Sequence, residues 1–387
     1  MRVEPFEIAV DEEVLADLRD RIARTRWPDQ IPGIGWEQGS EREYLRDLLA
    51  YWGGEFDWRA RERELNAHSQ FTADVDGTRI HFVHERARSD GRAAIPVILT
   101  HGWPSSFAEY LPLVPLLTDP RAHGIDGPAF DVVIPSLPGY GFSERPARTG
   151  QNTRATAAMW HKLMRGLGYR RYGAGGGDFG AGVATFMALD DPERAIVGLH
   201  LTNLEIAPYT GPGARPLSAA ERSYAAQIAS WDAVERGYSS IQSTKPQTVG
   251  YGLNDSPAGL AAWILEKWRS WTDSGGDLDA HFSRDSLLTL LTIYWVTQSI
   301  TATMRDYYDN RWFPERMGPQ DFVGVPTGIA VFRNQHVHEG DPPREWVERL
   351  YSVARWTPMP RGGHFAPAEE PELAARDIAA FFGALAT

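Results

Sequence analysis

Apolar and polar positions alternate along the chain in a pattern that changes near residues 90, 205 and 319. Between residues 91 and 204, short apolar runs such as IPVILTHG (95–102) and DVVIPSLPG (131–139) alternate with helical stretches such as TRATAAMWHKLMRGLG (153–168). Val- and Ile-rich runs that end in glycine are typical of buried parallel strands. The pattern therefore predicts an α/β fold with a mostly parallel central sheet, covered by helices on both faces.

The flanking segments follow other patterns. Residues 1–90 begin with two amphipathic helical stretches, which we interpret as an N-terminal arm that wraps the core. Residues 205–318 are aromatic and helical, and an insertion of this kind usually covers the carboxyl ends of the strands, so we predict a helical lid. Strand and helix return at 319–387, which we assign to a second part of the core that begins at 91–204.

The composition excludes several classes of protein. The net charge of −12 argues against nucleic acid as a partner, because phosphate binding requires clustered Lys and Arg. The absence of cysteine excludes disulfides and thiolate metal sites, and no His and carboxylate cluster has metal-ligand spacing, so we expect neither metal nor cofactor. Without a signal-peptide pattern or an apolar run of about 18 residues, we expect a cytoplasmic protein with no membrane partner.

The stretch GAGGGDFGAG (173–182) surrounds one carboxylate with glycines, between a predicted strand and a predicted helix. This is the setting of a nucleophile elbow, in which small residues two positions before and after the nucleophile permit a sharp turn. Its centre is Asp178, which disfavours a serine esterase. A phosphate loop fits poorly because the trailing Lys-Ser/Thr is absent. An ordinary turn with Asp178 as helix N-cap remains open from this stretch alone.

Two further motifs follow predicted strands. HGWP (101–104) places the backbone N–H of Trp103 where it could stabilise an oxyanion, and RGGHF (361–365) presents His364 on a glycine loop as a candidate base. Each motif alone is compatible with an ordinary turn. Together they follow the order oxyanion loop, nucleophile, histidine, which is the order of the α/β-hydrolase arrangement.

Longer segments around these motifs carry a family resemblance. They are HGWPSSFAEYLPLVPLLTDP (101–120), IPSLPGYGFSE (134–144), GGDFG (176–180), GYSSIQSTKPQTVGYGLNDSPAGLAAWILEKW (237–268), IYWVTQSITATMRDYY (293–308), VPTG (325–328) and RGGHFAPAEEPELAARDI (361–378). The sequence resembles the microsomal-type epoxide hydrolases of the α/β-hydrolase fold, in their soluble bacterial form. The resemblance covers essentially the whole chain, including the arm. It also extends to epoxide hydrolases of enediyne antibiotic pathways, which implies a role in secondary metabolism.

The resemblance implies a role for each matching residue. Asp178 takes the place of the family's nucleophile and His364 that of its histidine. The lid tyrosine of the GYxxIQ motif falls on Tyr238, and that of the RxYY motif on Tyr307, with Tyr308 as the neighbouring alternative.

The charge-relay acid is the one position that departs from the family pattern. Gln335 stands where the family has its acid, and an uncharged side chain orients an imidazole but stabilises an imidazolium less well. We predict that Glu339, four residues later, supplies the carboxylate. Glu205, after the predicted strand LHLTN, is the second candidate.

These residue types suit the hydrolysis of an epoxide to a vicinal diol. A carboxylate attacks the strained carbon to form an ester, phenols donate to the leaving oxygen, and water then cleaves the ester. The backbone N–H groups of Trp103 and Phe179 would hold the oxyanion. The aromatic lid predicts an apolar or aryl epoxide, and we place Trp231, Ser239 and Ser240 in the substrate pocket. The expected partners are this epoxide and water; a homodimer is compatible with the sequence, although no feature points to one.

Two other functions compete with this interpretation. A haloalkane dehalogenase also uses an aspartate elbow, but Phe179 offers no halide donor and paired lid tyrosines favour an epoxide oxygen. A catalytically inactive ligand-binding protein of the same fold is the second alternative, and Gln335 is the feature that supports it.

Overall fold

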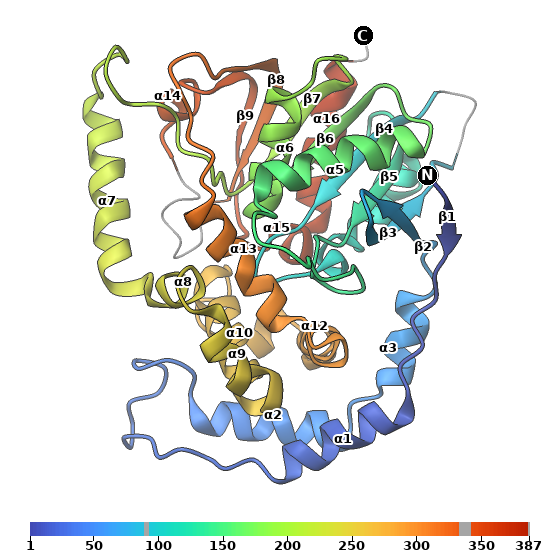
Figure 1. The fold of residues 1–387 in the computed structure, drawn as a ribbon, viewed down its shortest axis with the longest axis vertical. Coiled ribbons are helices and arrows are strands. Elements are labelled where there is room, and N and C mark those ends of the chain that lie inside the picture. Colours follow the sequence, from blue (N-terminus) through green and yellow to red (C-terminus); the bar gives the residue numbers. More distant parts are fainter. Residues whose placement is uncertain (89–92, 333–341, 386–387) are drawn as a thin grey trace.

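A nine-stranded sheet forms the centre of the molecule (Figure 1). The computed structural model describes residues 1–88, 93–332 and 342–385. The strand order is β1-β2-β3-β5-β4-β6-β7-β8-β9, with β1, β2 and β3 antiparallel and every pairing from β5 to β9 parallel. The mostly parallel α/β sheet is the one that the sequence predicts. The strands are β1 (Val3–Pro5), β2 (Gln70–Val75), β3 (Thr78–Glu85), β4 (Ile95–Thr100), β5 (Phe130–Pro135), β6 (Tyr172–Gly176), β7 (Ile196–Leu201), β8 (Val323–Val331) and β9 (Tyr351–Pro358).

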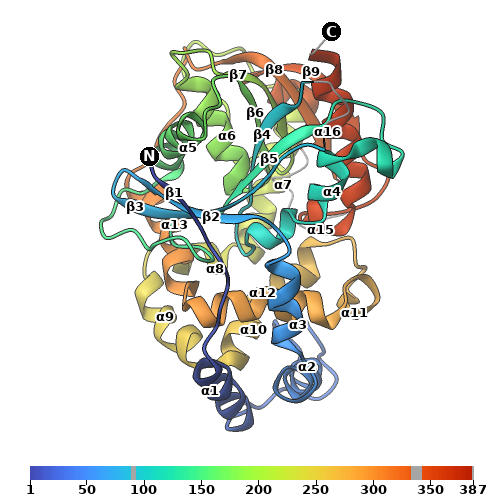
Figure 2. The same ribbon diagram turned by 90° about the vertical axis from the view of Figure 1, so that its right-hand side faces the viewer.

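Helices cover both faces of this sheet (Figure 2). Helices α5 and α6 pack on one face, and α4 and α16 on the other. Helix α6 is almost entirely apolar and buried because it lies between the strands and α5. The core helices are η1 (Phe107–Tyr110), α4 (Leu113–Thr118), η2 (Pro120–His123), α5 (Thr153–Gly166), α6 (Phe179–Leu189), α14 (Arg344–Val347), α15 (Ala366–Glu369) and α16 (Pro371–Leu385).

The segment between β7 and β8 folds into seven helices that lie beyond the carboxyl ends of the parallel strands (Figure 1). Of the helices in the described part of the chain, none is by itself long and apolar enough to cross a membrane. The α12 and α13 pair, bent by 86°, passes that test together by length and composition only. The helices of this lid are α7 (Ala219–Glu235), α8 (Gly237–Gln242), α9 (Pro246–Asp255), α10 (Pro257–Trp271), α11 (Leu278–His281), α12 (Arg284–Thr297) and α13 (Ile300–Trp312).

The N-terminal segment has two roles. Its strands β1 to β3 extend the sheet, while α1 (Glu12–Ala23), α2 (Arg42–Gly54) and α3 (Trp58–Leu65) pack against the lid on the side away from the sheet (Figure 1). The indole N–H of Trp52 donates to Thr292 Oγ1 at 2.9 Å, inside the interface between α2 and α12. The arm therefore ties the lid to the sheet.

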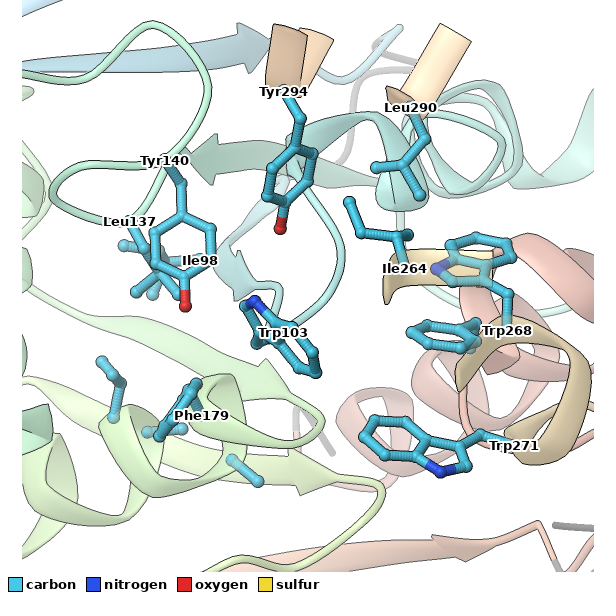
Figure 3. Packing of buried hydrophobic residues seen from close by; sticks show 14 of the residues in the cluster. Ile98, Trp103, Leu137, Tyr140, Phe179, Ile264, Trp268, Trp271, Leu290 and Tyr294 are labelled. Carbon is cyan, nitrogen blue, oxygen red and sulfur yellow. The ribbon is translucent and has the colours of Figure 1, made fainter. Parts of the chain in front are cut away.

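Buried hydrogen bonds join the lid to the loops at the strand ends, and Figure 3 shows the three side chains that donate them, Tyr294, Trp268 and Tyr140. The Tyr294 hydroxyl donates to the Ser105 carbonyl at 2.9 Å, and the Trp268 indole donates to the Pro104 carbonyl at 3.0 Å. From the core side, the Tyr140 hydroxyl donates to Thr303 at 3.2 Å. Because buried polar groups are costly to leave unpaired, these bonds hold the lid at a defined position over the strand ends.

Candidate active site

The glycines around Asp178 are required by close backbone contacts. Asp178 itself has φ 56° and ψ −131°, a strained conformation between β6 and α6 that raises its side chain above the strand ends. A Cβ on Gly176 would lie 2.4 Å from the Thr100 carbonyl oxygen, and one on Gly180 only 1.9 Å from it. The turn can therefore pack against β4 only when both positions lack a side chain. This accounts physically for the elbow motif.

One carboxylate oxygen of Asp178 sits between two backbone donors. Trp103 N–H donates to Oδ1 at 3.0 Å and Phe179 N–H donates to the same atom at 2.8 Å. Gly102 permits this approach, since a Cβ there would lie 2.3 Å from Oδ1. Both distances match those of the donors in an oxyanion hole.

The second carboxylate oxygen faces the histidine. His364 Nε2 lies 3.5 Å from Asp178 Oδ2, and the His364 side chain is 5 % exposed. The His364 backbone N–H donates to the Trp271 carbonyl at 2.8 Å, and its carbonyl accepts from Asn203 Nδ2 at 2.6 Å. Asn203 also accepts from the Asp178 backbone N–H at 3.0 Å, so it bridges the nucleophile and histidine loops. Nothing in the sequence motifs singled out this asparagine.

The third member of a triad is not seen among the described residues. The predicted acid Glu339 and the alternative Gln335 both fall in 333–341, outside the described residues. His364 Nδ1 is buried and has no hydrogen-bond partner in the described part of the chain. Glu205 is not that partner: its Oε2 lies beside α6, where a Cβ on Gly182 would approach it to 2.4 Å. The structure thus gives no support to Glu205 as the alternative acid.

Two lid tyrosines lie over the Asp178 carboxylate and Trp103. Tyr238, on α8, stacks on Trp103 with ring centroids 5.4 Å apart, and Tyr307, on α13, meets Trp103 edge to face at 5.6 Å. The centroids of the two phenol rings are 5.9 Å apart. Tyr308 instead packs near Trp312, at 6.1 Å, so Tyr307 is the tyrosine of the pair that lies at the site.

Burial and the nearby Asp178 carboxylate raise the pKa of the Tyr238 phenol. Burial raises the pKa of Tyr307 well above its usual value as well, with further contributions from Tyr238 and Asp178. Both hydroxyls therefore carry their protons at neutral pH, which is the form in which a phenol can donate.

The predicted pocket residues have different surroundings. Ser239 is buried, but Ser240 is exposed, and its carbonyl accepts from Thr244 Oγ1 at 2.6 Å. Two residues along a helix correspond to a rotation of about 200°, so Ser240 faces away from Tyr238, and its assignment to the pocket stays a prediction that its exposure does not support. Trp231 is buried, with the Arg236 guanidinium 5.3 Å above its ring, and its contribution to the pocket stays a prediction.

Aromatic side chains form the wall next to Asp178 and His364. Figure 3 shows Trp103 between Phe179 of the core and Trp271 of the lid. Trp271 lies 4.9 Å from the His364 ring and 5.5 Å from the Tyr238 ring, measured between centroids. The reacting groups therefore face a largely apolar space in which charge–dipole interactions are strong.

Comparisons with known proteins agree with this geometry. A family described as "Epoxide hydrolase N terminus" matches residues 3–110, and one described as "alpha/beta hydrolase fold" matches residues 95–204. A "Putative epoxide hydrolase" of Stigmatella aurantiaca is 40% identical over 97% of this chain and 84% of its own length. "Epoxide hydrolase 1" of Oryctolagus cuniculus is 40% identical over 98% of this chain and 89% of its own length.

Solved structures give the same result. The juvenile hormone epoxide hydrolase of Bombyx mori superposes with a TM-score of 0.85 at 31% identity, covering 100% of this chain and 94% of its own. The epoxide hydrolase of Aspergillus niger gives a TM-score of 0.84 at 29% identity, covering 100% and 97%. The fold, the N-terminal arm and the identity over nearly the full length confirm the resemblance found in the sequence. The chain belongs to the microsomal-type epoxide hydrolase family of the α/β-hydrolase fold.

Proposed function

We propose that this protein hydrolyses apolar or aryl epoxides to vicinal diols through a covalent ester on Asp178. The observation that carries the proposal is the surroundings of that carboxylate. Its Oδ1 is held by two backbone donors, its Oδ2 faces His364 Nε2, and two protonated phenols lie across the same space. A free carboxylate, a base and two proton donors are what epoxide opening followed by ester cleavage needs.

In the first step Oδ2 attacks an epoxide carbon and the carbon–oxygen bond of the ring breaks. The electron pair stays on the leaving oxygen, which takes a proton from Tyr238 or Tyr307 while the other phenol donates a hydrogen bond. Oδ1 becomes the carbonyl oxygen of the ester and keeps its bonds from Trp103 and Phe179. No rearrangement of the backbone is needed between the free carboxylate and the ester.

In the second step His364 takes a proton from water, and the hydroxide attacks Cγ of Asp178. The charge that develops on Oδ1 is stabilised by the Trp103 and Phe179 N–H groups. The ester then breaks between Cγ and Oδ2, and Oδ2 takes the proton that came in with the hydroxide. The diol leaves with Oδ2 as its new hydroxyl oxygen, and Asp178 is again a carboxylate. The proton held by His364 returns to the tyrosine through solvent, and the enzyme is restored.

The preference for an apolar substrate is supported by the walls of the site. Trp103, Trp271 and Phe179 surround the reacting groups, and Tyr238 also lines a cavity of about 680 Å³ between the arm and the lid. Trp27, Leu45 and Trp263 contribute apolar surface to that cavity. An aryl group or an alkyl chain attached to the epoxide would gain from leaving water in such surroundings.

Intact-protein mass spectrometry of a His364→Gln variant mixed with styrene oxide tests the proposal. The expected result is a mass gain of one substrate that maps to Asp178, since ester cleavage is blocked while attack is not. A single turnover of the wild type in ¹⁸O-water should place the label in Asp178 and leave the diol unlabelled. Diol formation with label in the diol and no adduct would instead establish direct attack by water.

The alternatives predict other outcomes. A haloalkane dehalogenase would release halide from haloalkanes. If the protein forms diol from epoxides and releases no halide, dehalogenase activity is excluded. An inactive binding protein would form no diol, and diol formation that is lost in Asp178→Asn excludes it. A cytoplasmic location, a homodimer and a place in antibiotic biosynthesis stay predictions from the sequence.

A further inference from the structure

A buried carboxylate holds the loop that carries His364. Glu369, at the end of α15, accepts hydrogen bonds from the backbone N–H groups of Gly363 at 3.0 Å and Phe365 at 2.9 Å, the two neighbours of His364. It accepts a third from the N–H of Asp273, in the lid, at 2.8 Å. Its side chain is fully shielded from solvent. One residue thus joins both sides of the histidine to the lid.

The lid provides the remaining partners of this loop. The Gly362 N–H donates to Asp273 Oδ2 at 2.9 Å, and the His364 N–H donates to the Trp271 carbonyl at 2.8 Å. Every backbone N–H from Gly362 to Phe365 is therefore bound, two of them by Glu369 and two by lid residues at the end of α10 and just after it. Such a chain of bonds fixes the position of an imidazole that is otherwise carried on glycines.

We propose that Glu369 is a positioning residue for His364, and that it acts on ester cleavage and leaves the attack of Asp178 on the epoxide largely untouched. This inference rests on the proposed function. Asp178 Oδ1 is aligned by Trp103 and Phe179, which lie outside the histidine loop, so alkylation depends on that loop less than ester cleavage does. Ester cleavage does depend on it, because water must be held between His364 and Cγ. A displacement of about 1 Å in such an arrangement costs on the order of 100-fold in rate.

The positioning depends on the ionised form of Glu369, because only the carboxylate can accept hydrogen bonds at both oxygens. Oε2 accepts from Gly363 and Asp273 while Oε1 accepts from Phe365, so both oxygens face donors. A glutamine would turn an NH₂ group toward at least one of these N–H groups, and two donors cannot bond to each other. Glu369→Gln therefore keeps the size of the side chain and breaks the set of bonds.

The ionisation of Glu369 makes the positioning of the His364 loop dependent on pH. Burial raises its pKa to about 7, although the three N–H bonds oppose the rise. The groups that face it are His281 of α11, with Nε2 3.7 Å from Oε2, Asp273 of the lid, and Glu109 of η1, whose own pKa burial raises to about 8. On its own element, the neighbouring Glu370 pairs with Arg361. The anion is the acceptor of all three bonds, so the positioning is present above pH 7 and is lost as the pH falls through that value.

Rapid-quench measurements with styrene oxide separate the two half-reactions. In Glu369→Gln, we expect the alkylation rate to stay within about threefold of wild type and ester cleavage to slow by about 10- to 100-fold, so that the ester accumulates. The matched control is Glu370→Gln, which removes a carboxylate one position away that binds an arginine side chain and no loop N–H. Both of its rates should match wild type. Between pH 8 and pH 6, ester cleavage should fall more steeply in wild type than in Glu369→Gln.

Other outcomes overturn the inference. Equal slowing of both steps would make Glu369 a general structural residue, and unchanged cleavage would remove its role. If Glu369→Gln does not fold, Asp273→Ala replaces it as the test variant. Asp273 lies in a half-buried loop, and its removal breaks the hydrogen bond from the Gly362 N–H. This variant should slow ester cleavage alone, by a smaller factor. If the wild type forms neither ester nor diol, the proposed function is refuted. If Glu369→Gln forms the ester and cleaves it at the wild-type rate, only the positioning role of Glu369 is refuted.

Discussion

The sheet side and the lid side of the site hold their reactive groups by different means. On the sheet side, Asp178 is held by the backbone N–H groups of Trp103 and Phe179 in a strained turn. On the lid side, Tyr238 and Tyr307 are held by ring contacts with Trp103. Backbone geometry has little freedom, whereas a packed side chain can be exchanged for another of similar shape. In the proposed mechanism the sheet side therefore sets the reaction, and the lid side can adapt the substrate and the strength of the proton donor.

The strongest test of the sheet side is Asp178→Asn. The amide oxygen can keep both backbone hydrogen bonds, so the fold is retained while the nucleophile is lost. We expect turnover to fall by about 10⁴-fold or more, the range for losing a nucleophile. Diol formation measured by chromatography, with circular dichroism to confirm the fold, gives the comparison. Activity near wild type would show that Asp178 only caps α6.

The corresponding test of the lid side is a pair of phenylalanine substitutions. The double variant Tyr238→Phe, Tyr307→Phe should slow alkylation by about 10²- to 10⁴-fold, the usual contribution of general acid catalysis. Each single variant leaves one donor to the epoxide oxygen, so each should lose less, on the order of tenfold. Stopped-flow measurement of ester formation provides the rates. If one single variant matches the double, the other tyrosine is a packing residue.

A pair of glycine substitutions compares backbone tolerance on the two sides. A Cβ on Gly180 would lie 1.9 Å from a backbone oxygen, so Gly180→Ala should destabilise the fold by about 1–3 kcal/mol and displace Asp178. Gly252 lies in the lid helix α9, is exposed, and has nothing within 4 Å of a Cβ. Gly252→Ala should raise stability by up to about 1 kcal/mol. Denaturant unfolding of both variants measures the difference, and equal effects would contradict the proposed rigidity of the sheet side.

This contrast also explains which parts of the site the sequence could predict. The elbow and the histidine loop are local motifs, because the glycines that permit them stand beside the residues that they expose. Asp178 and His364 are recognised for that reason. Tyr238 and Tyr307 came only from the family resemblance, since their position over Trp103 depends on how two lid helices pack.

Residues that depend on tertiary packing could not be read from spacing. Glu369 and Glu370 are adjacent glutamates in PAEEPEL. The short helix α15 directs Glu369 to the N–H groups of the histidine loop, whereas Glu370 pairs with Arg361. Ser240 is next to a buried serine in the sequence, yet the rotation of α8 exposes it. Lys267 is unremarkable in the sequence and is buried against Tyr238 in the fold.

The smallest expected effect concerns this lysine. Its ammonium lies 4.5 Å from the centroid of the Tyr238 ring and 6.0 Å from that of Trp271, it pairs with Glu266, and its side chain is only 8 % exposed. A cation over the ring favours the phenolate that forms when Tyr238 gives up its proton, and such contacts are worth about 0.5–2 kcal/mol. Lys267→Met keeps the apolar stem and should slow alkylation by roughly three- to tenfold.

A double-mutant cycle decides whether this effect passes through Tyr238. In a Tyr238→Phe background there is no phenol to ionise, so Lys267→Met should have little further effect on alkylation. Ester cleavage, which in the proposed mechanism uses His364 on the sheet side, should be the same with either residue at position 267. A Lys267→Met effect that persists unchanged without the phenol would mean that the lysine acts by packing the lid. Loss of the effect would show that the lid side adjusts its proton donor through a charge that lies directly over the phenol ring, whereas Asp178 on the sheet side is held by backbone N–H groups.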